Sequence, residues 1–132
     1  MDLKPKAVKR AEILKLMQLA KRTKAGLTLT DVPDIQWYGY YFKNKLVAFS
    51  ALFIRKKECR LRSSFIHPNY RGNGFYWNIL THRIQIAEEA GCEKITGWSN
   101  EHSLECCKRL GFDTGKTNRN NVTFIFKTLN DG

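Results

Sequence analysis

The chain has 132 residues, which suits one domain built around one hydrophobic core. Its content of 42% hydrophobic and 27% charged residues is typical of a globular protein. No apolar run approaches the ~20 residues of a membrane span, and no signal peptide is visible. We therefore expect a cytoplasmic protein. The formal net charge of +11 favours an acidic partner, such as nucleic acid, an acidic protein or a nucleotide.

The amino-terminal half predicts one helix followed by three strands. From Ala7 to Ala25, apolar residues recur with helical spacing, and Gly26 is a plausible end for the helix. Alternating or continuous apolar runs then predict a meander of three strands, joined by turns at residues 43–45 and 55–59. The predicted strands are Ile35 to Phe42, Leu46 to Ile54 and Arg60 to Ile66.

A glycine-containing loop follows the third strand and precedes a helix. Gly72 and Gly74 allow a positive φ and leave room for a ligand close to the backbone. The first amides of the helix lack intrahelical acceptors, and the helix dipole favours an anion there. Arg71 adds a cation with several donors. The stretch thus predicts a site for phosphate or pyrophosphate, although it matches neither the P-loop nor the full dinucleotide-binding pattern.

The carboxyl-terminal half predicts helices and strands in alternation. A strand, a helix and a second strand in this order imply parallel pairing of the two strands with a right-handed connection. Gly91 and Gly111 are expected to end the two helices. The expected elements are a helix from Trp77 to Ala90, a strand from Glu93 to Ser99, a helix from Glu101 to Leu110, an extended stretch from Phe112 and a strand from Val122 to Leu129.

The four cysteines do not form a metal-binding pattern. Cys59, Cys92, Cys106 and Cys107 show neither C-x-x-C nor zinc-finger spacing. We expect reduced, partly buried thiols and no metal.

Two short motifs resemble those of the GNAT superfamily of acyl-CoA-dependent N-acyltransferases. The run from Arg71 to Phe75 is similar to the family signature R/Q-x-x-G-x-G/A, and Tyr76 replaces its last small residue. Further along, Asn100, Gly111 and Phe112 stand in register with the family pattern N-x-x-A-x-x-x-Y-x-x-x-G-F. Ser103 and Cys107 occupy the Ala and Tyr positions of that pattern.

The resemblance implies a mixed α+β fold. This would be a single GNAT-like domain over residues 1–132, with a mostly antiparallel sheet, one splayed parallel pair and flanking helices. It also implies an N-acetyltransferase that transfers an acyl group from acetyl-CoA, or another acyl-CoA, to a primary amine. The residues that the resemblance assigns to the cofactor are Phe65, Ile66, His67, Arg71, Gly72, Asn73, Gly74, Phe75, Tyr76 and Asn100.

The catalytic candidates follow from the departures from the family pattern. A backbone amide of residues 65–67 would polarise the thioester carbonyl. Cys107 stands where many members have a tyrosine that protonates the leaving thiolate, and a thiol can also give a proton. No carboxylate is available as the base near Arg62, so His67 is the best titratable candidate. Asn100 is expected to cap a helix and to contact the pantetheine arm of the cofactor.

Three functions remain open at this point. Arg62 in place of an acid disfavours a cationic acceptor, so the acceptor amine is expected to be anionic or associated with nucleic acid. One alternative is acylation of a DNA or RNA base, as in phage-type base modification. Another is a GNAT-like binding module without catalysis. The acceptor and the oligomeric state are not determined by the sequence.

Overall fold

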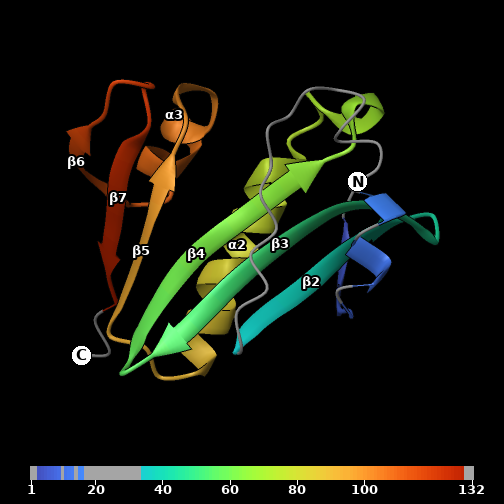
Figure 1. The fold of residues 1–132 in the computed structure, drawn as a ribbon, viewed down its shortest axis with the longest axis horizontal. Helices are drawn as coiled ribbons and strands as arrows, with labels where there is room; N and C mark the ends of the chain where they lie inside the picture. The colour runs from blue at the N-terminus through green and yellow to red at the C-terminus, as the bar shows by residue number, and fades with distance from the viewer. Residues whose placement is uncertain (1–2, 10, 14, 17–33, 130–132) are drawn as a thin grey trace. The chain divides into compact units, whose positions relative to one another are not determined.

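The structure is a computed structural model that describes residues 3–9, 11–13, 15, 16 and 34–129 (Figure 1). Residues 11–13, 15 and 16 are helical. The remaining elements are β1 (Lys4–Ala7), β2 (Ile35–Phe42), β3 (Lys45–Arg55), β4 (Glu58–Ile66), the 3-10 turn η1 (Pro68–Tyr70), α2 (Phe75–Glu89), β5 (Lys94–Ser99), α3 (Glu101–Arg109), β6 (Asp113–Thr117) and β7 (Thr123–Thr128).

The strands form one seven-stranded sheet in the order β1-β2-β3-β4-β5-β7-β6. Strands β4 and β5 are parallel and pair Glu58 with Lys94, while β5 with β7 and β6 with β7 are antiparallel. The predicted mixed fold, mostly antiparallel with one parallel pair, is therefore confirmed. The pairing also confirms the predicted strand-helix-strand crossover.

The chain divides into two compact units. The first comprises Met1–Leu52 and Arg62–Ile79. One of its cores brings Phe75 and Ile79 of α2 against Val47 and Ala48 of β3. Tyr40 belongs to the same core. The expectation of a single domain over residues 1–132 stays a prediction.

A buried hydrogen bond also ties β2 to β3 in the first unit. The hydroxyl groups of Tyr40 and Ser50 lie 2.7 Å apart, and both side chains are buried. Pairing of this kind satisfies the two buried hydroxyls, which would otherwise destabilise the core.

The second unit comprises Phe53–Leu61 and Leu80–Gly132. Helix α3 contacts β5 and β7, and Figure 1 shows it against one face of these two strands. Ile95 of β5, Ile125 of β7 and Cys107 of α3 are buried. Because side chains alternate across a strand, residues adjacent to these lie on the other face of the sheet.

Most predicted elements match the structure within one or two residues, with one clear exception. The helix predicted from Ala7 does not begin there, because Lys4–Ala7 forms β1 and pairs with β2, with Lys4 opposite Tyr41. The open edge of β2 supplies hydrogen-bond partners that sequence periodicity does not register, and Leu3 is buried in the adjoining core. Helical residues begin at Ala11, and the predicted helical positions 17–25 lie outside the described residues.

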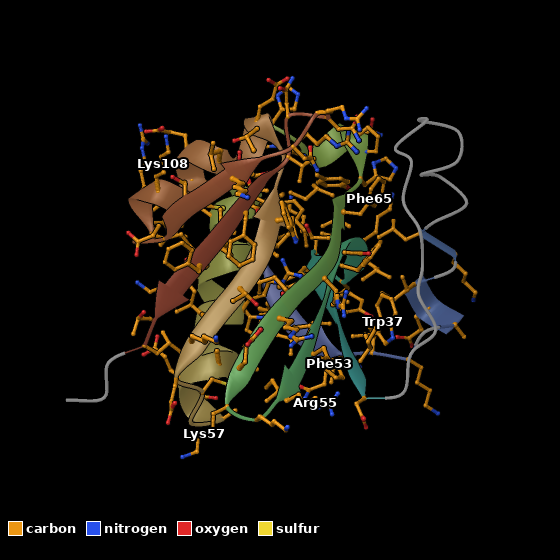
Figure 2. The ribbon with its side chains drawn as sticks, turned by 60° about the vertical axis from the view of Figure 1, so that its left-hand side comes forward. Trp37, Phe53, Arg55, Lys57, Phe65 and Lys108 are labelled. Atoms are coloured by element: carbon orange, nitrogen blue, oxygen red, sulfur yellow. The ribbon has the colours of Figure 1, made fainter. Side chains whose placement is uncertain are left out.

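The turn predicted at residues 55–59 is shorter in the structure. Only Lys56 and Lys57 form it, and both have a positive φ, as do Lys43 and Asn44 in the preceding hairpin. Figure 2 shows Arg55 and Lys57 at that end of the β3–β4 hairpin. Among the described residues, no helix is both long and apolar enough to cross a membrane.

Candidate functional site

Strand β4 leads directly into the predicted anion-binding loop, in the first unit. The backbone amide of His67 donates a hydrogen bond to the carbonyl of Val47 at 2.8 Å, which fixes the end of β4 against β3. The next three residues form η1, and the His67 Nδ1 atom accepts a hydrogen bond from the Asn69 amide at 3.1 Å. These two hydrogen bonds therefore fix the backbone where the chain passes from β4 into η1.

Arg71 is anchored by one side of its guanidinium group. Its Nε donates to the carbonyl oxygen of Ile66 at 2.9 Å, and its guanidinium carbon lies 5.4 Å from the centre of the Phe65 ring. Within the described part of the chain, its two terminal nitrogens make no hydrogen bond. The side chain is exposed, so these donors are held in place and remain open to an anion.

The two glycines of the loop have the left-handed backbone that the sequence predicts. Gly72 has a φ of 80° and Gly74 a φ of 76°, and, apart from the adjoining residues, no atom of the described part of the chain lies within 4 Å of the Cβ position of either glycine. Among the described residues, the amides of residues 72–75 find no backbone acceptor. The Asn73 side chain instead donates to the carbonyl of Tyr70 at 3.2 Å and closes the turn. This arrangement leaves several amides and one cation for a single anion.

Phe75, the aromatic residue that begins α2, packs its ring into the core of the first unit. Phe75 is 2% exposed, and its ring packs 5.8 Å from Phe42 and 6.4 Å from Tyr70. Only its backbone faces the loop, so a cofactor contact from Phe75 would come from its amide. Tyr76, which replaces the small residue of the family signature, is half-buried.

Asn100 occupies the matching position in the second unit, between β5 and α3. Its Oδ1 accepts hydrogen bonds from the Ser103 amide at 2.9 Å and the Ser103 hydroxyl at 2.7 Å, so it is the helix cap. The hydroxyl of the preceding residue, Ser99, donates to the Asn100 carbonyl at 2.9 Å. In the described residues the Nδ2 group of Asn100 has no hydrogen-bond partner. Asn100 can therefore cap α3 and still donate to a ligand.

The two catalytic candidates lie in different environments. The Nδ1 atom of His67 is engaged by Asn69, so in the neutral ring Nε2 carries the proton. Such a ring accepts a substrate proton only by breaking the bond to Asn69. Cys107 is fully buried in α3. The amide of His67 is also used, by Val47, which removes it from the set that could polarise a thioester.

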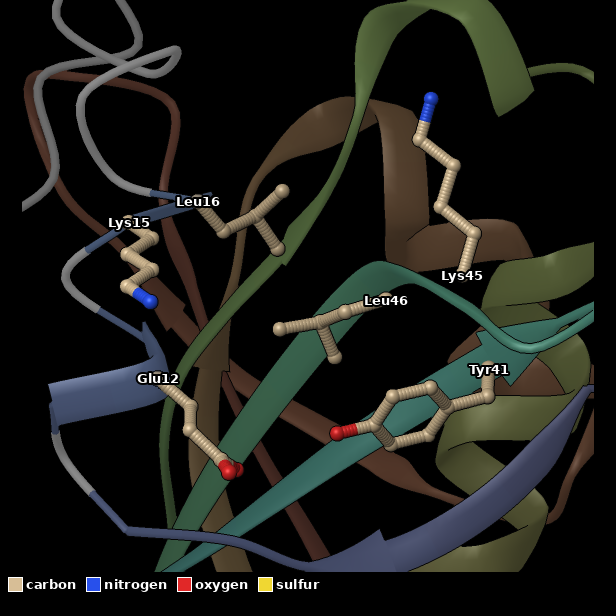
Figure 3. Close-up of a pocket in the computed structure, with 6 residues that line it drawn as sticks. All are labelled: Glu12, Lys15, Leu16, Tyr41, Lys45 and Leu46. Atoms are coloured by element: carbon tan, nitrogen blue, oxygen red, sulfur yellow. The ribbon is translucent and has the colours of Figure 1, made fainter.

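A pocket that the sequence did not indicate lies in the first unit (Figure 3). Its volume is about 390 Å³, and it is lined by Glu12, Lys15, Leu16, Tyr41, Lys45 and Leu46. The Tyr41 hydroxyl and the Glu12 carboxylate both point into it. Burial and the nearby charge of Glu12 raise the pKa of Tyr41 above its usual value, so the phenol stays protonated.

The predicted site residues thus form two groups. The loop residues from Phe65 to Tyr76 come together in the first unit, and Asn100 and Cys107 lie in the second. The sequence indicated the loop through its glycines and arginine. It gave no signal for the bonds that already occupy the His67 ring and amide, because those depend on Val47 and Asn69.

Solved structures of low sequence identity share this fold. The acyl-CoA N-acyltransferase assigned in Klebsiella pneumoniae aligns with a TM-score of 0.78 and 15% identity over 97% of this chain and 98% of its own. An acetyltransferase from Bacillus subtilis, solved with CoA, aligns with a TM-score of 0.77 and 13% sequence identity over 98% of this chain and 100% of its own. The PaiA N-acetyltransferase from Thermoplasma acidophilum, also solved with coenzyme A, aligns with a TM-score of 0.63 and 17% sequence identity. The alignment covers 87% of this chain and 70% of the PaiA chain.

A search of curated protein sequences found no significant match. The profile of the acetyltransferase (GNAT) family matches residues 11–112, which include the glycine loop, Asn100 and most of the sheet. The chain belongs to the acetyltransferase (GNAT) family.

Proposed function

We propose that this protein is an acyl-CoA-dependent N-acyltransferase, with acetyl-CoA or another acyl-CoA as the donor. The observation that carries the proposal is the loop after β4, where the amides of residues 72–75 lack backbone acceptors and Arg71 holds open donors. A diphosphate fits this donor set, because it supplies several anionic oxygens at once. CoA contains a diphosphate, and two solved structures with this fold hold CoA.

The chemistry requires little from the side chains. The nitrogen of a neutral amine attacks the thioester carbonyl and forms a carbon–nitrogen bond as the carbon–sulfur bond breaks. The nitrogen gives up one proton, and the CoA thiolate leaves and takes up one. The loop holds the diphosphate, and the Asn100 Nδ2 group is proposed to donate to the pantetheine arm. Holding the donor in one orientation contributes to the rate because it removes the entropy cost of that alignment from the reaction step.

His67 remains the proposed base and Cys107 the proposed acid, but His67 Nδ1 already accepts a hydrogen bond and Cys107 is buried. A water molecule that relays the proton to solvent would replace either group. The contribution of His67 is measured by the pH profile of kcat for His67→Gln, and an unchanged profile removes His67 from the mechanism.

The proposed acceptor is an amine that is anionic or attached to nucleic acid. The support is the exposed Arg62 on β4 and the net charge of +11. Acylation of a DNA or RNA base is the related alternative, and a binding module without catalysis is the other. We also propose a cytoplasmic location.

Binding of acetyl-CoA by calorimetry, followed by CoA release with a panel of amines, tests the proposal. We expect Arg71→Ala to weaken acetyl-CoA by about 10- to 100-fold, the range for losing a charge-assisted contact of about 1.5–3 kcal/mol. Arg55→Ala removes an exposed arginine from the β3–β4 hairpin (Figure 2) and serves as the control for charge. An absence of binding at millimolar acetyl-CoA would reject the proposal. Binding without CoA release from any amine would favour the inactive module.

A further inference from the structure

Three aromatic side chains gather on the sheet face of the second unit that α3 does not cover. Trp98 of β5 is 58% exposed and Phe126 of β7 is 36% exposed, which is unusual for such large apolar groups. Phe124 lies between them, with ring centres 5.2 Å from Trp98 and 5.9 Å from Phe126. We name these three residues the aromatic face.

The backbone fixes the direction of these rings. Trp98 is directly opposite Phe124 across the β5–β7 pair, and Phe126 is opposite Thr96. Their neighbours Ile95 and Ile125 are buried on the side of α3. A Cβ on Gly115 of β6 would lie 3.2 Å from the Phe124 ring, so that ring packs closely over a bare stretch of backbone. The rings therefore form a continuous apolar surface that is fixed by strand pairing.

Basic side chains border the aromatic face on the β4 side. Arg60 is paired with Thr96 in the register, and Lys94 is paired with Glu58, so both side chains share the face of Trp98. Glu58 binds both of them, with its carboxylate 2.8 Å from Arg60 Nε and 3.4 Å from Lys94 Nζ. One carboxylate thus orients two cations, and the group keeps a net positive charge.

We infer that this face binds single-stranded nucleic acid, with bases stacked on Trp98, Phe124 and Phe126 and phosphates on Arg60 and Lys94. Exposed aromatics on adjacent strands beside cations are what unpaired bases require, because every base offers a flat π-face and every nucleotide a phosphate. A duplex is disfavoured because its bases are stacked on one another. A second copy of this chain is disfavoured because it would bring a further charge of +11 to the same surface.

The test is the fluorescence anisotropy of a labelled oligothymidine of about 16 nucleotides, the upper end of the footprint of small sheet-based modules. We expect Trp98→Ala and Phe126→Ala each to weaken binding by at least about fivefold, the effect of losing one stacked base. Trp77→Ala removes a tryptophan that is 41% exposed on α2 and is the matched control, with an expected change below about twofold. Equal losses for Trp77→Ala and Trp98→Ala would overturn the inference.

The contribution of phosphate contacts to oligothymidine binding is measured by how the affinity depends on salt concentration. The affinity should fall as salt rises, and Lys94→Gln should reduce the slope of log K against log salt by about 0.7, the value for one phosphate contact on a single strand. Lys108→Gln, on the exposed side of α3, is the control and should leave this slope nearly unchanged (Figure 2). A slope that is flat in the unmodified protein would overturn the inference.

Other nucleic-acid probes and the oligomeric state distinguish base stacking from a purely electrostatic contact and from self-association of this chain. A duplex of the same length and an abasic strand should both bind more weakly than oligothymidine, and equal binding of all three would show a purely electrostatic contact and reject stacking. If sedimentation shows dimers that Trp98→Ala dissociates, the face is a self-association surface and the inference is wrong. None of these experiments uses acyl-CoA, so their failure is distinct from failure of the proposed acyl transfer.

Discussion

The loop after β4 and the turn after β5 solve the same structural problem in opposite ways. Each carries the chain from a strand into a helix and leaves the first amides of that helix without intrahelical acceptors. In the turn after β5, Asn100 caps Ser103 with its side-chain oxygen. In the loop after β4, the amides of residues 72–75 have no backbone acceptor among the described residues.

This difference supports the proposed anion site in the loop after β4. A side-chain cap of the Asn100 kind would use the donors that a diphosphate requires. The loop after β4 is instead stabilised by the Phe75 ring in the core and by the bond from Arg71 Nε to the Ile66 carbonyl, and neither contact uses the amides of residues 72–75 or the terminal nitrogens of Arg71. The stability of this loop and its ability to bind are therefore separable by mutation.

The largest expected effect comes from removing the anchor of the open loop. Phe75→Ala should lower the free energy of unfolding by about 3–5 kcal/mol, because Phe75 is 2% exposed in the core with Val47 and Ile79. Chemical denaturation measures it. Trp77→Ala, two residues along the same helix, should cost less than about 1 kcal/mol. Equal costs for the two would mean that Phe75 does not anchor the turn.

The next effect separates backbone strain from ligand binding. Gly74→Ala should weaken acetyl-CoA by about 10-fold or more, since a left-handed alanine costs about 1–2 kcal/mol and relaxing it reorients the loop amides. Gly91→Ala is the matched control, because Gly91 has a φ of 75° and equally open surroundings after α2. Both variants should lose similar stability, measured by thermal unfolding. If calorimetry finds the same acetyl-CoA affinity in both, the loop is not the diphosphate site.

A pair of substitutions at Asn100 tests the closed turn. Asn100→Ala should destabilise the protein by about 1 kcal/mol, because the helix loses its cap. Asn100→Asp keeps an oxygen for the Ser103 amide but removes the Nδ2 donor. It should therefore retain stability and still weaken acetyl-CoA binding. A loss of affinity only in the alanine variant would assign Asn100 a capping role alone.

The smallest expected effect is a change in stability from Glu58, at the start of β4, which pairs with Lys94 at the start of β5. Hydrogen bonds from Thr96, together with Arg60 and Lys94, hold the pKa of Glu58 below its usual value, against an opposing effect of burial. A lowered carboxyl pKa contributes stability above the unfolded value of about 4.3, and this contribution is lost as the pH falls through the folded pKa.

The comparison variant is Glu58→Gln, with unfolding measured at several pH values. The variant should lose less than about 1 kcal/mol at neutral pH, since the neighbouring cations are exposed and screened. The difference between the two proteins should shrink in acid. A difference that is constant with pH would show that the carboxylate charge does not contribute.

The sequence predicted the elements whose pattern is local. The boundaries of β2 matched because eight residues rich in aromatics stand between clear turns. Strand β1 was missed because Lys4–Ala7 has little strand preference of its own and is held by pairing with β2. The local sequence of these four residues does not indicate pairing with β2, which lies more than thirty positions away in the chain.

The candidate site divides in the same way. Gly72, Gly74 and Arg71 indicated an anion site because their chemistry is intrinsic, and the structure places them together. The direction of the Phe75 ring and the bond between the His67 amide and Val47 arise from packing. A residue type shows what a group can do, whereas the fold determines which of its atoms remain available.

The two lysines at the tip of the β3–β4 hairpin have a practical consequence for protein engineering. Lys56 and Lys57 adopt φ values of 49° and 63°, a geometry that costs each side chain about 1–2 kcal/mol and that asparagine and glycine accept readily. The side chain of Lys57 forms an exposed ion pair with Glu93, which contributes little to stability, and the Lys57 carbonyl accepts a hydrogen bond from the Glu93 amide at 2.7 Å. Replacing these lysines with asparagine or glycine should therefore raise the stability of the protein, and with it the tolerance to other mutations, without altering either of the two turns proposed to bind the cofactor.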